Sequence, residues 1–423
     1  MSLPPDIVSV MQEISSWYEH ELASRLNIEF RAFPEQMAIT DPLYGVIRIP
    51  RYVAFLASIP IVDRLFGVRQ LALTGLKYVG ATHTRLEHSL GVAYLLTNIP
   101  KDIDEIDKMI LWIAGLLHDI GHPCWGHALD GVVGRVVSQL MDYKPIEIWT
   151  QIGVLPIFYP SKLDQTITSY LLYCNEQLLN ALDTVQKEFC RRFERWHGLD
   201  LSRPFLLRDI IACVISEEEH ATNFFMKDHH YQIPEEAKRR IRYFQKLLGH
   251  EVNCDRLDWL PRDIHHAFIK FLDEDHLNRL KDITKRIEQL MAEGVIMDEQ
   301  SGDVKIKSQE REEQESREIE ALQGKLRMFR EFLYRRFYES HERALMDSLL
   351  CRLVYTTLIM MHEIIKRARL YSPSVSGRLI IAYMLLPDDK ICYYSEKILD
   401  SSARLPFALA ERMMYFINNT RAL

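Results

Sequence analysis

The sequence contains no Cys-x-x-Cys pair, and only seven cysteines are spread over its 423 residues. An odd number of cysteines cannot form a closed set of disulfides. We therefore expect reduced thiols and a cytoplasmic location.

Long apolar runs are also absent. The longest, residues 353–361 and 379–386, are much shorter than the roughly 20 residues that a membrane-spanning helix needs. Residues 1–6 lack a basic segment leading into an apolar one, so we expect no signal peptide. The sequence predicts no membrane partner.

Neither sign of charge is in large excess. The formal net charge of -7 argues against a protein that coats polyanions in general, although it leaves room for a local basic surface. The hydrophobic share of 48% and the charged share of 26% are typical of a globular protein. A chain of this length can form one large domain or two ordinary ones without disulfides.

Alternating strand patterns are scarce, and most segments show the spacing of amphipathic helices. Strands are predicted at residues 44–49 and in a small hairpin formed by residues 295–297 and 304–306. The charged stretch 308–320 is typical of a solvated helix face or a connection. We predict a mainly all-α protein with at most small β-hairpins.

The predicted organisation has two parts. Residues 1–275 form a helical core that carries the chemistry, with an insert near residues 135–205. Residues 276–423 form a mainly helical C-terminal extension packed on that core.

The first chemical motif lies in residues 83–91. Thr84 followed by Glu87 is a capping box, which predicts that a helix begins here. Arg85 and His88 are three residues apart and share one face of that helix. A cation beside a candidate metal ligand suits an anionic substrate, whereas a capped surface helix with an incidental histidine is the alternative.

The second motif follows an apolar helix predicted at residues 109–117. That helix runs directly into His118 and Asp119, followed by Gly121 and His122. Buried ionisable groups are costly unless they are paired or bound to a metal. An imidazole nitrogen and a carboxylate oxygen favour divalent Mn, Fe, Co, Ni, Zn or Mg.

The third motif contains Asp255, Trp259, Arg262 and His266, which share one face if the segment is helical. That face would carry a carboxylate, an aromatic ring and a cation, as a nucleotide at a metal requires. The alternative is an N-capping Asp255 in a solvated acidic turn. Pro261 must either kink this helix or start a new one.

In this order, the three motifs resemble the H…HD…D pattern of the HD-domain phosphohydrolase superfamily. The resemblance is closest to the deoxynucleoside triphosphate (dNTP) triphosphohydrolase branch, through Asp41-Pro42-Leu43-Tyr44-Gly45 and residues 64–71 and 80–91. It covers residues 40–130 strongly and 210–270 moderately, and it returns weakly near residues 334–338 and 388–389. It implies an HD-domain helical core and a homo-oligomer, as in many relatives.

The resemblance also implies roles for single residues. The divalent metal (Mn, Mg, Fe, Co, Ni or Zn) would be bound by His88, His118, Asp119 and Asp255. Catalytic roles would fall to Arg85, His122 and His127. Substrate contacts would come from a wider set: Arg64, Gln70, Leu71, Arg256, Trp259 and Asp263.

Three departures from the family pattern bear on function. The usual Arg-Leu-Arg reads Arg64-Leu65-Phe66, which weakens the inference of a nucleotide effector site. Trp259 stands where the family often has tyrosine. The usual His-Glu pair is replaced near residues 217–219 by three glutamates, and we expect Glu217 or Glu218, with Glu218 preferred, to face the site. The alternative is that all three glutamates lie on a solvated turn.

The sequence thus predicts an enzyme, a metal-dependent phosphohydrolase that converts dNTPs to deoxynucleoside and triphosphate. One alternative from the same superfamily is a phosphodiesterase or nuclease acting on a signalling nucleotide or single-stranded DNA. Another is a non-catalytic regulator that binds nucleotide without turnover.

Overall fold

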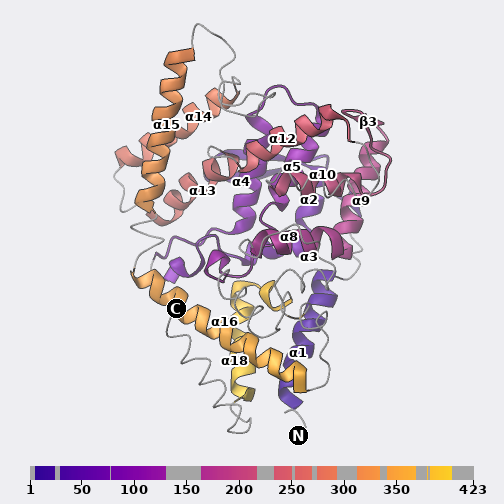
Figure 1. Cartoon of the computed structure of the whole chain (residues 1–423), viewed down its shortest axis with the longest axis vertical. Coiled ribbons are helices and arrows are strands. Elements are labelled where there is room, and N and C mark those ends of the chain that lie inside the picture. The colour runs from indigo at the N-terminus through magenta and orange to yellow at the C-terminus, as the bar shows by residue number, and fades with distance from the viewer. Residues whose placement is uncertain are drawn as a thin grey trace.

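The computed structural model describes residues 5–23, 29–76, 78–129, 163–216, 233–249, 253–268, 274–292, 312–333, 341–367, 379 and 382–402. Helices dominate these residues, as the sequence predicts (Figure 1). Among them, no helix is both long enough and apolar enough to cross a membrane.

The described strands form two small antiparallel hairpins. Strand β1 (Gln36–Asp41) pairs with β2 (Gly45–Pro50), and β3 (Arg195–Trp196) pairs with β4 (Leu199–Asp200). The strand predicted at residues 44–49 is confirmed as β2. Its partner β1 was not predicted because most of its side chains are exposed and show no alternation. The hairpin predicted at residues 295–306 lies outside the described residues.

Two packed helices form the centre of the upper part of the molecule, α4 (Arg85–Asn98) and α5 (Glu105–Leu117). The Thr84 hydroxyl accepts a hydrogen bond from the Glu87 N–H at 3.4 Å and caps α4, as predicted. Asp104 caps α5 through a capping box with Asp107. The helices approach closely at Gly115, where an added Cβ would lie 2.5 Å from the Ala93 backbone. This contact brings the residues after Leu117 near the start of α4.

Further helices enclose this pair. They are α2 (Arg51–Ala57), α3 (Pro60–Asp63), α8 (Leu163–Cys174), α9 (Glu176–Cys190), α10 (Leu206–Ile215), α12 (Glu235–Gly249) and α13 (Cys254–Asp263). Short 3₁₀ segments lie at Phe30–Ala32, Arg64–Gly67, Ala72–Leu76 and Gly126–Leu129, and π-helical segments at Tyr18–Ala23 and Ile264–Phe268. Pro261 lies inside α13 rather than starting a new helix, and the π-helical turn follows directly.

The remaining helices lie at the two ends of the long axis (Figure 1). Helix α14 (Glu274–Ala292) packs with α15 (Glu312–Leu333) at the upper end. At the lower end, α1 (Pro5–Trp17), α16 (His341–Arg367) and α18 (Asp388–Ser402) contact one another. Lys397 and Glu13 form an exposed ion pair of 3.4 Å between α18 and α1. The first and last described helices are therefore neighbours.

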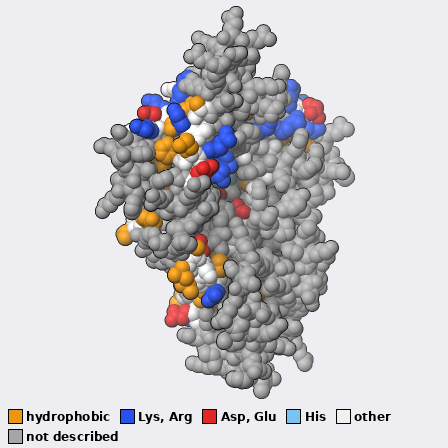
Figure 2. All heavy atoms as spheres, turned by 60° about the vertical axis from the view of Figure 1, so that its left-hand side comes forward, with side chains coloured by type: hydrophobic (Ala, Val, Ile, Leu, Met, Phe, Trp, Pro, Cys, Tyr) orange, Lys and Arg blue, Asp and Glu red, His pale blue; other side chains and the backbone are white. Residues whose placement is uncertain are grey.

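Basic side chains lie on the outer helices. Arg239 of α12 and Arg279, Lys281 and Lys285 of α14 are exposed. Figure 2 shows Lys and Arg side chains gathered in the upper half of the face that it presents. The same helices also expose Glu235, Glu236 and Asp282, so these basic side chains lie among carboxylates.

Candidate metal centre

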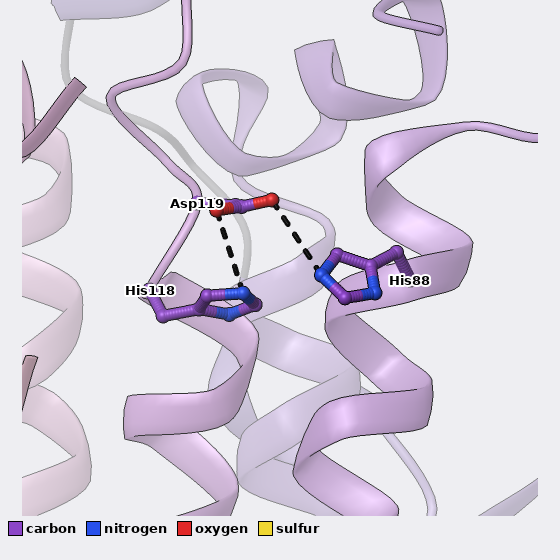
Figure 3. Close-up of side chains that lie close together, drawn as sticks. All are labelled: His88, His118 and Asp119. Atoms are coloured by element: carbon purple, nitrogen blue, oxygen red, sulfur yellow. Dashed lines mark ion pairs between the residues drawn. The ribbon is translucent and has the colours of Figure 1, made fainter. Parts of the chain in front are cut away.

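Two histidines and an aspartate meet where α5 ends beside the start of α4 (Figure 3). One ligand atom from each of His88, His118 and Asp119 lies within 4.8 Å of the others, in a group that could hold a metal ion. Nε2 of His118 is 3.4 Å from Asp119 Oδ1, and Nε2 of His88 is 3.7 Å from Asp119 Oδ2. The structure thus brings His88 together with the adjacent pair His118 and Asp119, which follow the next helix in the sequence.

Asp255 approaches the same group from α13. Its Oδ1 lies 2.9 Å from Nε2 of His88 and 3.8 Å from Nε2 of His118. The N-cap of α13 is Asn253, whose side chain accepts the Arg256 N–H at 2.7 Å. Asp255 is therefore not the capping residue, and its carboxylate faces both imidazoles.

The charges of this group suit a cation. Burial alone would raise the pKa of Asp119. The nearby His118, His122 and Arg85 lower it by more than burial raises it, so the carboxyl group is ionised. The pKa of Asp255 is also lowered, because the nearby imidazoles of His118 and His88 outweigh its burial. Nε2 of His118 is buried and has no hydrogen-bond partner among the described residues. These nitrogen and oxygen atoms fit a divalent cation.

A buried network that the sequence did not predict holds His88 in place. The Nδ1–H of His88 donates to Asp258 at 2.7 Å, and Arg262 donates two hydrogen bonds of 2.8 Å to the same carboxylate. Arg262 also forms a 2.9 Å ion pair with Asp41, at the end of β1. Gly91 makes this packing possible, since an added Cβ would lie 2.0 Å from Asp258.

This network changes the interpretation of Arg262. We expected its charge to lie on a face with Asp255 and Trp259, available to a nucleotide. Instead it is fully buried and bound to Asp41 and Asp258. Its guanidinium neutralises two carboxylates and orients a candidate metal ligand.

His122 lies on the other side of Asp119. Its Nε2 is 3.3 Å from Asp119 Oδ1 and 3.4 Å from Oδ2 of Asp164. Burial lowers the pKa of His122, and the charge of Arg85 lowers it further. The Gly121 N–H donates to the Thr168 hydroxyl at 3.0 Å, which fixes the first turns of α8 against this loop.

Asp164 was missed from the sequence. It lies beyond a stretch without a motif, and a single aspartate near a helix start normally indicates only a favourable helix dipole interaction. The catalytic carboxylate was predicted in the acidic run at residues 217–219 instead. Glu217, Glu218 and Glu219 lie outside the described residues, as does the side chain of His127.

Arg85 is buried and its Nη1 donates to Asp119 at 2.5 Å. Its Nε has no hydrogen-bond partner in the described part of the chain. An acceptor brought to this edge, such as an anion, would satisfy the Nε–H.

The expected substrate positions lie in two places. Arg64 is buried and its Nη2 donates to the carbonyl of Ile120 at 2.5 Å and of His122 at 2.8 Å, so it supports the loop that carries His122. Leu71 is buried, and Gln70 has a buried Oε1 without a partner within the described ranges.

The other expected positions lie on α13. Trp259 and Arg256 are half-buried. Asp263 is buried and lies 2.8 Å from Nε2 of His83, whose ring stacks on His266 at 4.6 Å. Burial lowers the pKa of His266 to about 4, and the neighbouring His83 adds to this effect, so His266 is neutral near pH 7.

A known family model matches the segment that carries three of these residues. The HD domain model matches residues 85–152, which begin at Arg85 and include His88, His118 and Asp119. This segment of the chain is therefore similar to the HD domain family. Curated relatives named as dNTP triphosphohydrolases match a longer part of the chain, which agrees with the resemblance of the sequence motifs.

Three relatives illustrate the extent of the similarity. The deoxynucleoside triphosphate triphosphohydrolase SAMHD1 of Xenopus laevis is 32% identical over 265 residues, which cover 59% of this chain and 37% of that protein. The Gallus gallus protein of the same name is 26% identical over 208 residues, covering 45% of this chain and 33% of the relative. The Homo sapiens protein is 36% identical over 102 residues, covering 22% and 16%. The aligned part of this chain thus covers between 16% and 37% of the length of these relatives.

Proposed function

We propose that this HD-domain protein is a metal-dependent phosphohydrolase that converts dNTPs to deoxynucleoside and triphosphate. The observation that carries the proposal is the buried meeting of His88, His118 and Asp119, with Asp255 beside them. The similarity to relatives named as dNTP triphosphohydrolases supports the choice of substrate.

His88, His118, Asp119 and Asp255 would hold one divalent cation. Such a cation polarises a phosphoryl oxygen and lowers the pKa of a bound water, which supplies a nucleophile near neutral pH. The protein contributes the ionised carboxylates of Asp119 and Asp255, together with an imidazole oriented by Asp258.

His122 would carry the proton. Its lowered pKa keeps the imidazole neutral near pH 7, so it can accept a proton from water attacking the α-phosphorus. Asp164 can orient the ring and stabilise its charged form, because its carboxylate lies 3.4 Å from Nε2. We retain His127 and Glu218 as further catalytic candidates from the family resemblance.

Arg85 would bind the phosphate chain. With a cation held at Asp119, the carboxylate would pair less strongly with Arg85, whose guanidinium could then turn its donors to an anion. Gln70, Leu71, Arg256, Trp259 and Asp263 would contact the nucleoside part, and Arg64 would act from beneath the loop of His122. The active form would be a homo-oligomer, as in many members of the family.

One observation favours a second candidate, hydrolysis of single-stranded nucleic acid. The exposed Lys and Arg side chains of α12 and α14 would attract a phosphate backbone (Figure 2). A mononucleotide substrate does not need charges so widely distributed over the surface.

One experiment separates these functions. Purified protein is incubated with Mn²⁺, Mg²⁺, Co²⁺ or Ni²⁺ and with dNTPs, NTPs, dinucleotides or single-stranded DNA, and the products are identified by mass. Deoxynucleoside and triphosphate are the expected products, and their loss in His118→Ala/Asp119→Ala excludes a contaminating enzyme. Mononucleotides released from DNA would favour the second candidate, and no product with any metal would overturn both.

A further inference from the structure

One carboxylate from the C-terminal part of the chain binds two segments beside the candidate site, the loop after His122 and the segment that leads into α4. Asp388 is the first residue of α18, which otherwise packs against α1 and α16. Its Oδ1 accepts the backbone N–H of Trp125 at 3.0 Å, and its Oδ2 accepts the backbone N–H of Arg69 at 3.0 Å. Each oxygen of the half-buried carboxylate therefore holds a different segment.

The first segment is the loop that follows His122. Trp125 is buried and has a φ of 57°, and Gly126 also has a φ of 57°. A bulky residue in this left-handed region is rare and persists only where the surroundings impose it. The neighbouring Cys124 N–H donates to the Met384 carbonyl at 3.2 Å, so two consecutive loop amides bind the C-terminal part.

The second segment leads into α4. Arg69 forms a β-bridge with Thr84, and its neighbours Val68 and Gln70 extend this pairing. The Arg85 N–H donates to Val68 at 2.9 Å, and the Gln70 N–H donates to His83 at 3.0 Å. Holding Arg69 therefore holds the start of α4, from which Arg85 and His88 project.

The two segments also meet at Arg85. Gly126 packs against its guanidinium, since an added Cβ would lie 2.8 Å from Nη2. A shift of the Trp125 loop would thus change the place of Arg85 and of His122, without touching the interior packing of α4 against α5.

We propose that Asp388 is a positioning residue that joins the His122 loop to the start of α4 and so sets the geometry of the site. This proposal rests on the proposed phosphohydrolase function for its effect on turnover. Asp388 does not touch the reacting atoms. It acts through two backbone amides, which makes a correctly docked α18 a condition for activity.

The test compares Asp388→Asn with Glu396→Gln, an exposed carboxylate on the same helix. Asparagine has nearly the same shape, but its amide presents a donor to one of the two N–H groups, so one hydrogen bond is lost. Hydrogen exchange of the metal-loaded, substrate-free protein is followed at the Trp125 and Arg69 amides and along α5. Triphosphate release from an equal mixture of the four dNTPs gives kcat and KM.

In Asp388→Asn we expect exchange at Trp125 or Arg69 to accelerate about tenfold or more, while α5 keeps its protection. We expect kcat to fall by about tenfold, with KM changed less, because the affected groups act on the reacting phosphate. Glu396→Gln should match the wild type in both measurements. Asp388→Ser, whose single shorter oxygen can reach at most one of the two amides, should be impaired at least as much as Asp388→Asn.

Unchanged exchange at both amides in Asp388→Asn would overturn the proposal, and so would faster exchange with full kcat. Equal acceleration along α5 would also overturn it, because it would show general destabilisation. If the wild-type protein shows no turnover, the proposed phosphohydrolase function is refuted instead. Hydrogen exchange at the Trp125 and Arg69 amides would then decide alone whether Asp388 joins the two segments.

Discussion

His88 is held between two carboxylates of one helix. Its Nδ1–H donates to Asp258 at 2.7 Å, and its Nε2 lies 2.9 Å from Asp255. The first contact fixes the ring and its tautomer, and the second places Nε2 beside a further candidate ligand. A histidine oriented in this way by a carboxylate is a common support for a metal ligand.

Replacing Asp258 should weaken metal binding. We expect Asp258→Asn to lower the affinity for Mn²⁺ or Co²⁺ by about 10- to 100-fold, as losses of such supporting carboxylates do. Isothermal titration calorimetry measures the affinity. Asp282→Asn, an exposed aspartate of α14, serves as the control. Equal affinities in the two variants would contradict the role of Asp258.

Metal binding should release protons. Burial opposes the charge of His88, but hydrogen bonds and charges from Asp255 and Asp258 outweigh it and raise the pKa of His88 to about 10 in the metal-free protein. Near pH 7 the imidazole is therefore protonated, and a cation must displace its Nε2 proton. Affinity should rise with pH up to about pH 10.

Calorimetric titrations in buffers of different ionisation enthalpy count the released protons. We expect about one proton per metal ion at pH 7 from His88, and a further fraction from His118, whose pKa Asp119 and Asp255 raise despite its burial. Metal affinity that is independent of pH between 6 and 9 would exclude His88 as a ligand that starts protonated.

Removing the central pair should remove the metal. His118→Ala/Asp119→Ala eliminates a nitrogen and an oxygen ligand at the end of α5, whose interior packing lies elsewhere. We expect no bound metal by elemental analysis and nearly unchanged helicity by circular dichroism. Full metal occupancy in the double variant would refute this ligand set.

Arg85→Ala should separate binding from turnover. Without the guanidinium, Asp119 loses a competing cation, so metal affinity should stay the same or increase. Phosphate binding loses a charged donor, and we expect kcat/KM to fall by about 100-fold. Steady-state kinetics and calorimetry on one preparation test both expectations. Unchanged kinetics would show that Arg85 does not bind the substrate.

Asp164 and Glu218 are alternative candidates for the carboxylate that assists proton transfer. The charge of Asp164 raises the pKa of His122, although burial and Arg85 lower it overall. In Asp164→Asn, the limb of the pH–rate profile that reports His122 should therefore move to lower pH, with kcat reduced about tenfold or more. The same measurements are made on Glu218→Gln, and the exposed Glu176→Gln on α9 is the control.

A larger loss in Glu218→Gln than in Asp164→Asn would favour the acidic run and reject Asp164. Full activity in both variants would leave His122 and His127 to move the proton without a carboxylate partner.

Local sequence patterns predicted the helices that carry the candidate ligands. The Thr84 cap and the apolar run before His118 act over a few residues, so they are readable without knowing the fold. The structure confirms both helices, and their crossing at Gly115 brings His88 and His118 together.

Contacts between distant segments could not be predicted. Asp164 meets His122 because Gly121 and Thr168 fix α8 against the loop, and Arg262 is buried because Asp41 and Asp258 surround it. Nothing in the spacing around Arg262 distinguishes a buried charge pair from an exposed cation. The distinction depends on a partner about 220 residues earlier in the chain, at the end of β1, which only the tertiary fold brings near.

The packing of α1 against α18 has a consequence for biosynthesis. Residues 5–17 are synthesised long before their partner at residues 388–402. The lower end of the molecule cannot complete its packing during translation of the HD core, and Asp388 reaches the Trp125 loop only at the same late stage. A nascent chain therefore contains both α4 and α5 long before Asp388 is available to hold the Trp125 loop, and with the proposed positioning role turnover should begin only after synthesis has passed residue 388.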